Sequence, residues 1–110
     1  MHELSLTQNV VDVCVRKAEG RRVTLVTLEI GALSGVEPEA MAFCFEACTR
    51  DTLLEGARLD IERVTPRATC DECGREFSPT AYFDPCPGCG GYRLQLLAGE
   101  ELRIKFLEVE

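Results

Sequence analysis

The sequence contains no tryptophan, a single histidine and only 6% aromatic residues among its 110 positions. No apolar run approaches the roughly 18 residues of a membrane-spanning helix, so we expect no membrane insertion. The first residues carry neither a basic nor an apolar segment, so we expect no secretory signal and a cytoplasmic protein. The 19 acidic residues outnumber the 12 basic ones, and the resulting net charge of −7 disfavours nucleic acid as a partner.

Cysteine, by contrast, is abundant, with seven residues in a chain long enough for one domain or one small domain with an insert. Disulfides are rare in the cytoplasm, and an odd number of cysteines fits a full disulfide framework badly. We therefore expect the cysteines to be metal ligands, reactive thiols or small core residues.

The first half of the chain predicts two helices around a strand. Residues 5–19 carry apolar side chains at helical spacing, with Ser5 and Gln8 in capping-box positions and Gly20 as a C-cap. Residues 23–30 are mostly β-branched and apolar, which favours a strand. A second helix is expected to begin near Pro38, because proline suits the first helical position.

The second half predicts strands on either side of an insert. Residues 57–64 and 102–106 alternate between apolar and polar, and we expect the last strand to return to the sheet formed by the earlier two. The fold class is therefore α+β, a small mixed sheet with two helices plus an inserted zinc-ribbon-like domain. The expected bounds are 1–66 and 94–110 for the α/β domain and 67–93 for the insert.

The insert contains two Cys-x2-Cys pairs, and Gly74 and Gly90 follow their second cysteines. Each pair can supply two sulfur ligands to one tetrahedral Zn²⁺, and a glycine at the next position permits the tight turn. Because no ligand position stays open, we expect this zinc to be structural and to perform no chemistry. The predicted zinc ligands are Cys70, Cys73, Cys86 and Cys89.

The other three cysteines, Cys14, Cys44 and Cys48, lie on the apolar faces of the two predicted helices. Cys44 and Cys48 are spaced like a pair that could bind a metal or act in redox chemistry. No basic residue flanks them to lower a thiol pKa, so we interpret all three as small core residues.

The only histidine is His2, beside the N-terminal amine. The Met1 amine and the amide and imidazole nitrogens of His2 can form fused chelate rings on one ion, and Glu3 can complete the plane through its amide nitrogen or its carboxylate. Nitrogen-rich planar coordination suits Ni²⁺ or Cu²⁺ better than Zn²⁺. Binding should weaken as the pH falls through about 6.5, where an ordinary imidazole gains a proton. The alternative is a solvated terminus.

Three features together resemble the HypA/HybF family of hydrogenase nickel-incorporation proteins. They are the Met1-His2-Glu3 start, the Gly-x-Leu-Ser-x-Val-x-Pro-Glu segment over 31–39 and the zinc insert. The resemblance covers essentially the whole chain. It implies a nickel metallochaperone without catalytic activity, with nickel ligands at Met1, His2 and Glu3 and zinc ligands at the four insert cysteines.

The resemblance also implies partners. These are a maturation GTPase of the HypB type and the large subunit of [NiFe] hydrogenase, and in some relatives the urease maturation proteins. Some relatives carry further histidines beside the zinc cysteines or at the nickel site, but this chain has only His2. We further expect Glu3, Glu37 and Glu39 to contribute to a docking face near the nickel.

Three other functions share the four-cysteine insert. A zinc-ribbon module for nucleic acid requires a basic surface and exposed aromatics, which the composition disfavours. A thiol redox enzyme requires a dithiol that no metal sequesters. A zinc-ribbon adaptor without a nickel role stays open, and a test of metal binding at the N-terminus distinguishes it from a nickel carrier.

Overall fold

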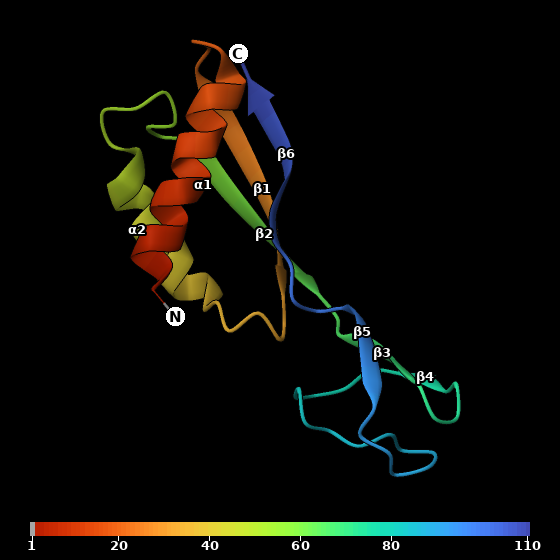
Figure 1. The fold of residues 1–110 in the computed structure, drawn as a ribbon. Coiled ribbons are helices and arrows are strands. Elements are labelled where there is room, and N and C mark those ends of the chain that lie inside the picture. Colours follow the sequence, from red (N-terminus) through yellow and green to blue (C-terminus); the bar gives the residue numbers. More distant parts are fainter. Residues whose placement is uncertain (1) are drawn as a thin grey trace.

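The computed structural model describes residues 2–110 as an elongated molecule of 53 × 22 × 17 Å, with two units joined end to end (Figure 1). The larger unit carries both helices, and the smaller unit carries the predicted insert. The elements in chain order are α1 (Glu3–Ala18), β1 (Val23–Gly31), α2 (Pro38–Thr49), β2 (Arg58–Val64), β3 (Arg67–Cys70), β4 (Glu76–Phe77), β5 (Leu94–Ala98) and β6 (Leu102–Val109).

The larger unit is a mixed three-stranded sheet in the order β2-β1-β6, with both helices on one face. β1 pairs with β2 in parallel, through the crossover that α2 provides, and with β6 in antiparallel orientation. The inward side chains of β1, Val26, Leu28 and Ile30, are fully buried against the helices. The predicted α+β class and the return of the C-terminal strand to this sheet are confirmed.

The helix ends differ in part from expectation. α2 begins at Pro38 as predicted, but α1 begins at Glu3 with His2 as N-cap, and no side chain caps it. The predicted capping box at Ser5 is wrong, because the Leu6 N–H already bonds to the His2 carbonyl and starts the first turn earlier. At the other end the left-handed C-cap is Glu19, one residue before the expected Gly20.

The smaller unit contains a second three-stranded sheet, in the order β4-β3-β5. The domain boundary expected at residue 94 falls inside this sheet, because β5 pairs with β3 and places Leu94 opposite Cys70 and Leu96 opposite Ala68. In the sequence the apolar residues Tyr92, Leu94 and Leu96 alternate with polar ones, but this alternation does not identify a partner strand. By strand pairing, this unit therefore extends to Ala98.

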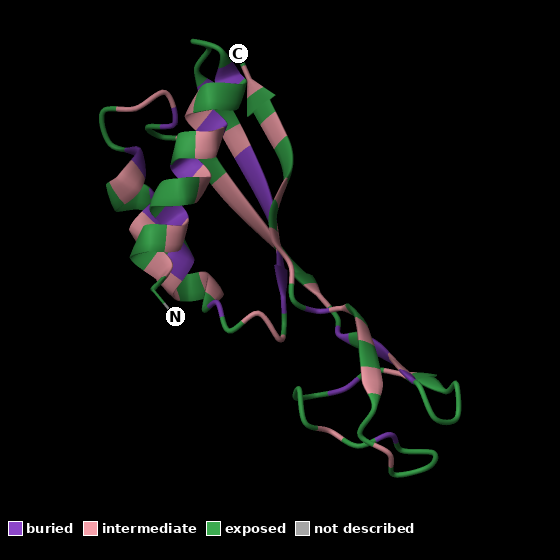
Figure 2. Cartoon of the chain, in the orientation of Figure 1, coloured by how far each residue is buried: buried purple, intermediate pink, exposed green. Residues whose placement is uncertain are grey.

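Burial is distributed unevenly between the units. Figure 2 shows the buried residues concentrated in β1 and on the helix surfaces that face it, with few in the smaller unit. The buried apolar side chains of that unit are Ala68, Cys70, Pro79 and Cys86. So small an apolar core is typical of a domain that a bound metal stabilises.

The units meet at a close backbone crossing. The Leu33 N–H donates to the Gly99 carbonyl at 2.7 Å, and the Gly31 N–H donates to the Glu101 carbonyl at 2.7 Å. A Cβ at Gly31 would overlap the Gly99 carbonyl, and a Cβ at Gly99 would lie 2.9 Å from the Pro66 Cα. Three segments distant in the sequence are thus in backbone contact at the junction.

Within residues 2–110, no helix has the length and apolar character required to cross a bilayer.

Candidate metal centres

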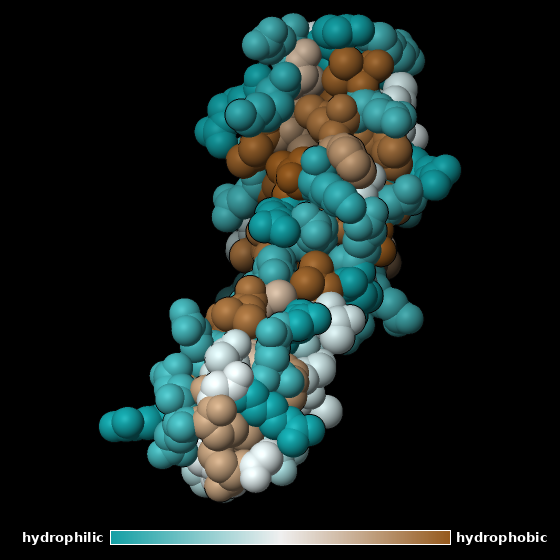
Figure 3. Space-filling model, turned by 90° about the vertical axis from the view of Figure 1, so that its right-hand side faces the viewer, coloured by the Kyte–Doolittle hydropathy of each residue, from teal (hydrophilic) through white to brown (hydrophobic). Residues whose placement is uncertain are grey.

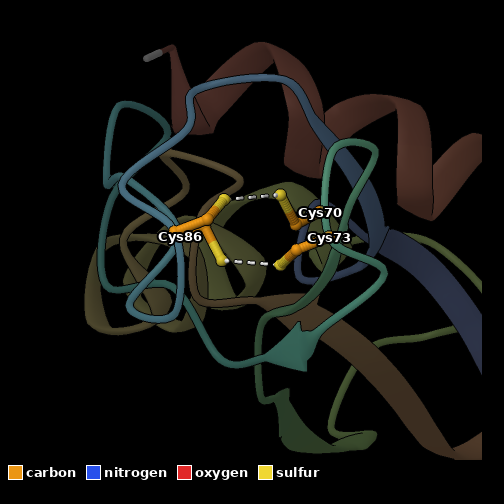
Figure 4. A group of neighbouring side chains, drawn as sticks. Cys70, Cys73 and Cys86 are labelled. Atoms are coloured by element: carbon orange, nitrogen blue, oxygen red, sulfur yellow. Dashed lines mark hydrogen bonds between the residues drawn. The ribbon is translucent and has the colours of Figure 1, made fainter.

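The four insert cysteines converge at the end of the smaller unit. Their sulfur atoms all lie within 4.8 Å of one another, and the Cys70–Cys89 and Cys73–Cys86 Sγ atoms are each 3.6 Å apart. Figure 4 shows the thiols of Cys70, Cys73 and Cys86 pointing toward a common centre. Four sulfurs at the usual Zn–S bond length of about 2.3 Å would be about 3.8 Å apart in a tetrahedron. The cluster therefore fits one zinc ion.

Two similar turns produce this arrangement. The Gly74 N–H donates to the Cys70 carbonyl and the Gly90 N–H to the Cys86 carbonyl, each at 2.8 Å. Both glycines have positive φ, +78° and +75°, which residues with a Cβ adopt only at a cost. The predicted role of these glycines is confirmed.

The electrostatics of the thiols favour a bound cation. Backbone N–H groups, first that of Cys89 and then that of Gly88, lower the pKa of the Cys86 thiol to about 7. At Cys89 the Gly91 N–H acts in the same direction, but Cys70 and the other neighbouring thiols outweigh it and raise the pKa to about 12. Four thiolates so close together repel one another, and a divalent cation relieves that repulsion.

The composition of the cluster indicates a structural role. Among residues 2–110, this is the one group of three or more potential ligands close enough to hold an ion, and it consists of cysteines alone. Four sulfurs complete the coordination of Zn²⁺ and leave no position for a reacting water. The four-cysteine cluster is therefore that of a structural zinc site.

The remaining cysteines lie in the helices. Cys14 is fully buried in the core, and Cys48 is half-buried against it. Burial raises the pKa of the Cys14 thiol to about 11, and burial followed by the nearby Cys44 raises that of Cys48. Cys44 is half-buried on α2. Raised thiol pKa values disfavour reactivity in Cys14 and Cys48.

His2 and Glu3, two of the three predicted nickel residues, lie at the start of α1, and Glu3 contacts the start of α2. His2 is exposed, Glu3 is half-buried, and Met1 lies outside the described residues. The Glu37 N–H donates to the Glu3 carboxylate at 3.1 Å, and this bond lowers the Glu3 pKa. Sequence reasoning missed this contact, because its partners are 34 residues apart and no local pattern connects them.

Comparison with known proteins agrees with these features. The sequence model of one family, described as "Hydrogenase/urease nickel incorporation, metallochaperone, hypA", matches residues 1–109. The chain belongs to the HypA family. Similar curated relatives include the hydrogenase maturation factors HypA of Geobacter metallireducens and Geobacter sulfurreducens, 66% and 62% identical over 110 residues that span the whole of each chain.

Two solved structures share the fold of this HypA-family chain. The solution structure of the Ni metallochaperone HypA from Helicobacter pylori has a TM-score of 0.71 at 24% identity, covering 99% of this chain and 97% of that one. A second, titled "Solution structure of HypA protein", has a TM-score of 0.73 at 25% identity, with 100% and 97% coverage. The family is one of nickel metallochaperones for hydrogenase and urease maturation, and the resemblance stated from the sequence is confirmed.

Proposed function

We propose that this chain is a nickel carrier that binds Ni²⁺ at its N-terminus and helps to insert it into the large subunit of [NiFe] hydrogenase. The observation that carries the proposal is the match to the nickel-incorporation family over residues 1–109. That match also disfavours a zinc-ribbon adaptor without a nickel role. The ligands would be the Met1 amine, the backbone and imidazole nitrogens of His2, and Glu3.

The contacts of Glu3 support a backbone-centred nickel site. Its carboxylate is engaged by the Glu37 N–H, and its own amide belongs to the first turn of α1, where N–H groups have no partner within the helix. We infer that the Glu3 amide nitrogen completes the plane begun by Met1 and His2. The carboxylate would then anchor this turn against α2.

The exposure of the site suits a carrier. His2 is open to solvent, so that bound nickel could be transferred to another protein. The ligands alone would prefer Cu²⁺ to Ni²⁺, because copper forms the more stable complexes with nitrogen donors. We infer that partner docking supplies the selectivity. The exposed Glu37 and Glu39, on the α2 side of the site, are the candidates for such contacts.

The zinc assignment is the second part of the proposal. Cys70, Cys73, Cys86 and Cys89 would hold one Zn²⁺ that stabilises the smaller unit, in which few apolar side chains are buried. The partners would be a HypB-type maturation GTPase and the hydrogenase large subunit, with urease maturation proteins where the cell contains them.

A transfer assay tests delivery. Protein loaded with radioactive nickel is incubated with the GTPase, GTP and the nickel-free large-subunit precursor, and the label in the precursor is counted. We expect transfer from the wild type and from a control substituted at an exposed α1 position, Gln8→Ala. We expect none from His2→Ala. Equal transfer from His2→Ala and the wild type would contradict the proposal.

A further inference from the structure

Three glycines lie in and beside the second cysteine turn, over residues 86–91. Only Gly90 has a positive φ, which favours glycine over other residues. Gly88 and Gly91 do not, so the backbone conformation does not explain why these two positions carry no side chain. The side chains that surround them give a different reason.

Gly88 makes room for Arg75, which belongs to the first cysteine turn. A Cβ at Gly88 would lie 3.1 Å from the Arg75 Cδ and 3.4 Å from its Nη1. The same point is 3.7 Å from the Cys86 Sγ. The backbone of Arg75 is fixed as well, because its carbonyl accepts the Cys70 N–H at 2.8 Å. Its guanidinium is therefore held beside one of the four zinc ligands.

Gly91 makes room for Glu72 in the same way. A Cβ at Gly91 would overlap the Glu72 carboxylate, and it would lie 3.3 Å from the Cys89 Sγ. Two side chains of opposite charge from the first turn are thus seated on the second turn. Each of them lies beside a different zinc ligand.

These two charges act on a cluster that is itself anionic. Four thiolates outweigh the charge of one Zn²⁺, so the complex keeps a net negative charge. A guanidinium beside Cys86 attracts that charge, and a carboxylate beside Cys89 repels it. The free energy of the zinc complex should therefore depend on both side chains, with opposite sign.

The exposure of both side chains limits the size of the effect. Arg75 and Glu72 are open to solvent. Figure 3 shows hydrophobic side chains gathered over the larger unit, and hydrophilic ones around the smaller unit at the bottom of the view. Interactions between charges in contact with water are weak and are screened by salt. We therefore expect changes of a few-fold in zinc affinity.

We propose that Arg75 and Glu72 set the zinc affinity of the cluster in opposite directions. Arg75 strengthens zinc binding from the Cys86 side, and Glu72 weakens it from the Cys89 side. Neither residue is a ligand, and each acts through its charge beside one cysteine. The inference rests on the proposed zinc site and does not depend on the nickel role.

Zinc affinity at equilibrium tests the two charges. Zinc dissociation constants of the wild type, Arg75→Gln and Glu72→Gln are measured in zinc buffers, with bound zinc counted by elemental analysis. At about 0.01 M salt we expect the constant to be about five-fold higher for Arg75→Gln and about three-fold lower for Glu72→Gln. At about 1 M salt, where the Debye length is about 3 Å, both differences should fall below about two-fold.

Three further variants separate charge from packing. Arg75→Lys keeps the charge and should bind zinc within about two-fold of the wild type. Gly88→Ala keeps Arg75 but displaces its side chain, so it should weaken binding about three-fold, and adding Arg75→Gln to it should have little further effect. Arg67→Gln is the matched control, because Arg67 pairs with Glu76 at the other end of β3, and it should leave zinc binding unchanged.

Two results would overturn the inference. One is equal zinc affinity in the wild type, Arg75→Gln and Glu72→Gln. The other is a loss in Arg75→Gln that neither high salt nor Arg75→Lys removes, which would indicate packing alone. A wild type that binds no zinc would instead overturn the zinc assignment. Tighter binding by Glu72→Gln cannot result from damage to the fold, so this variant tests the inference even where another one folds poorly.

Discussion

Single residues contribute in different ways to the two proposed metal centres. The zinc cysteines act as a group, because their sulfurs converge within 4.8 Å and repel one another once ionised. His2, the only histidine, is the one imidazole available to a nickel site. We therefore expect a single substitution to affect metal binding differently at the two proposed centres.

Substitution of Cys86 tests the zinc centre. Cys86→Ser should lower zinc affinity by more than about 100-fold, because a thiolate ligand is lost. The smaller unit should lose its structure while the larger sheet persists, since the two sheets do not share a strand. Zinc content and amide NMR spectra measure both effects. Cys44→Ser, outside the cluster, is the matched control and should keep its zinc.

At the scale of elements, the Glu3 carboxylate joins the starts of α1 and α2. The bond from the Glu37 N–H lowers the Glu3 pKa from its ordinary value of 4.5. Because the pKa is lower in the folded state, the contact stabilises the fold above pH 4.5 and is lost as the pH falls through the lowered value. This bond between the two helix starts should therefore weaken only in acid.

An acid titration followed by NMR measures this contact. The Glu37 amide resonance of the wild type should shift with a midpoint below pH 4.5, as the Glu3 carboxylate gains its proton. In Glu3→Gln that transition should disappear. A wild-type midpoint at or above 4.5 would show that the bond is absent in solution.

The local sequence pattern predicted the helices, strands and turns themselves better than the pairing between strands. The strand over 23–30, the helix start at Pro38 and the cysteine turns follow from residue type and spacing, and the structure confirms them. The prediction that α1 starts at a Ser5 cap is wrong, because the backbone forms the first turn from Glu3 without a side-chain cap. The pairing of β5 with β3 depends on contacts between distant segments, which local periodicity does not encode.

At the scale of the whole molecule, the junction holds the zinc unit to the unit that carries the N-terminus. Gly31→Ala should destabilise the protein by about 2–4 kcal/mol, because the new Cβ would overlap the Gly99 backbone. Gly20→Ala, at a positive φ with open space around it, should cost only about 1 kcal/mol. Urea unfolding measures both. An equal loss of stability in Gly31→Ala and Gly20→Ala would mean that the backbone segments at the junction move apart readily, and would contradict this prediction.

The central claim is that nickel binds at the N-terminus while zinc is held elsewhere. The most direct measurement is a calorimetric Ni²⁺ titration of zinc-loaded protein with a native, untagged N-terminus at about pH 7.5, where protons compete little with metal ions, beside His2→Ala. The account predicts one equivalent of nickel bound by the wild type and none by the variant, with zinc retained in both. Equal nickel binding by the two proteins, or none by either, would contradict it.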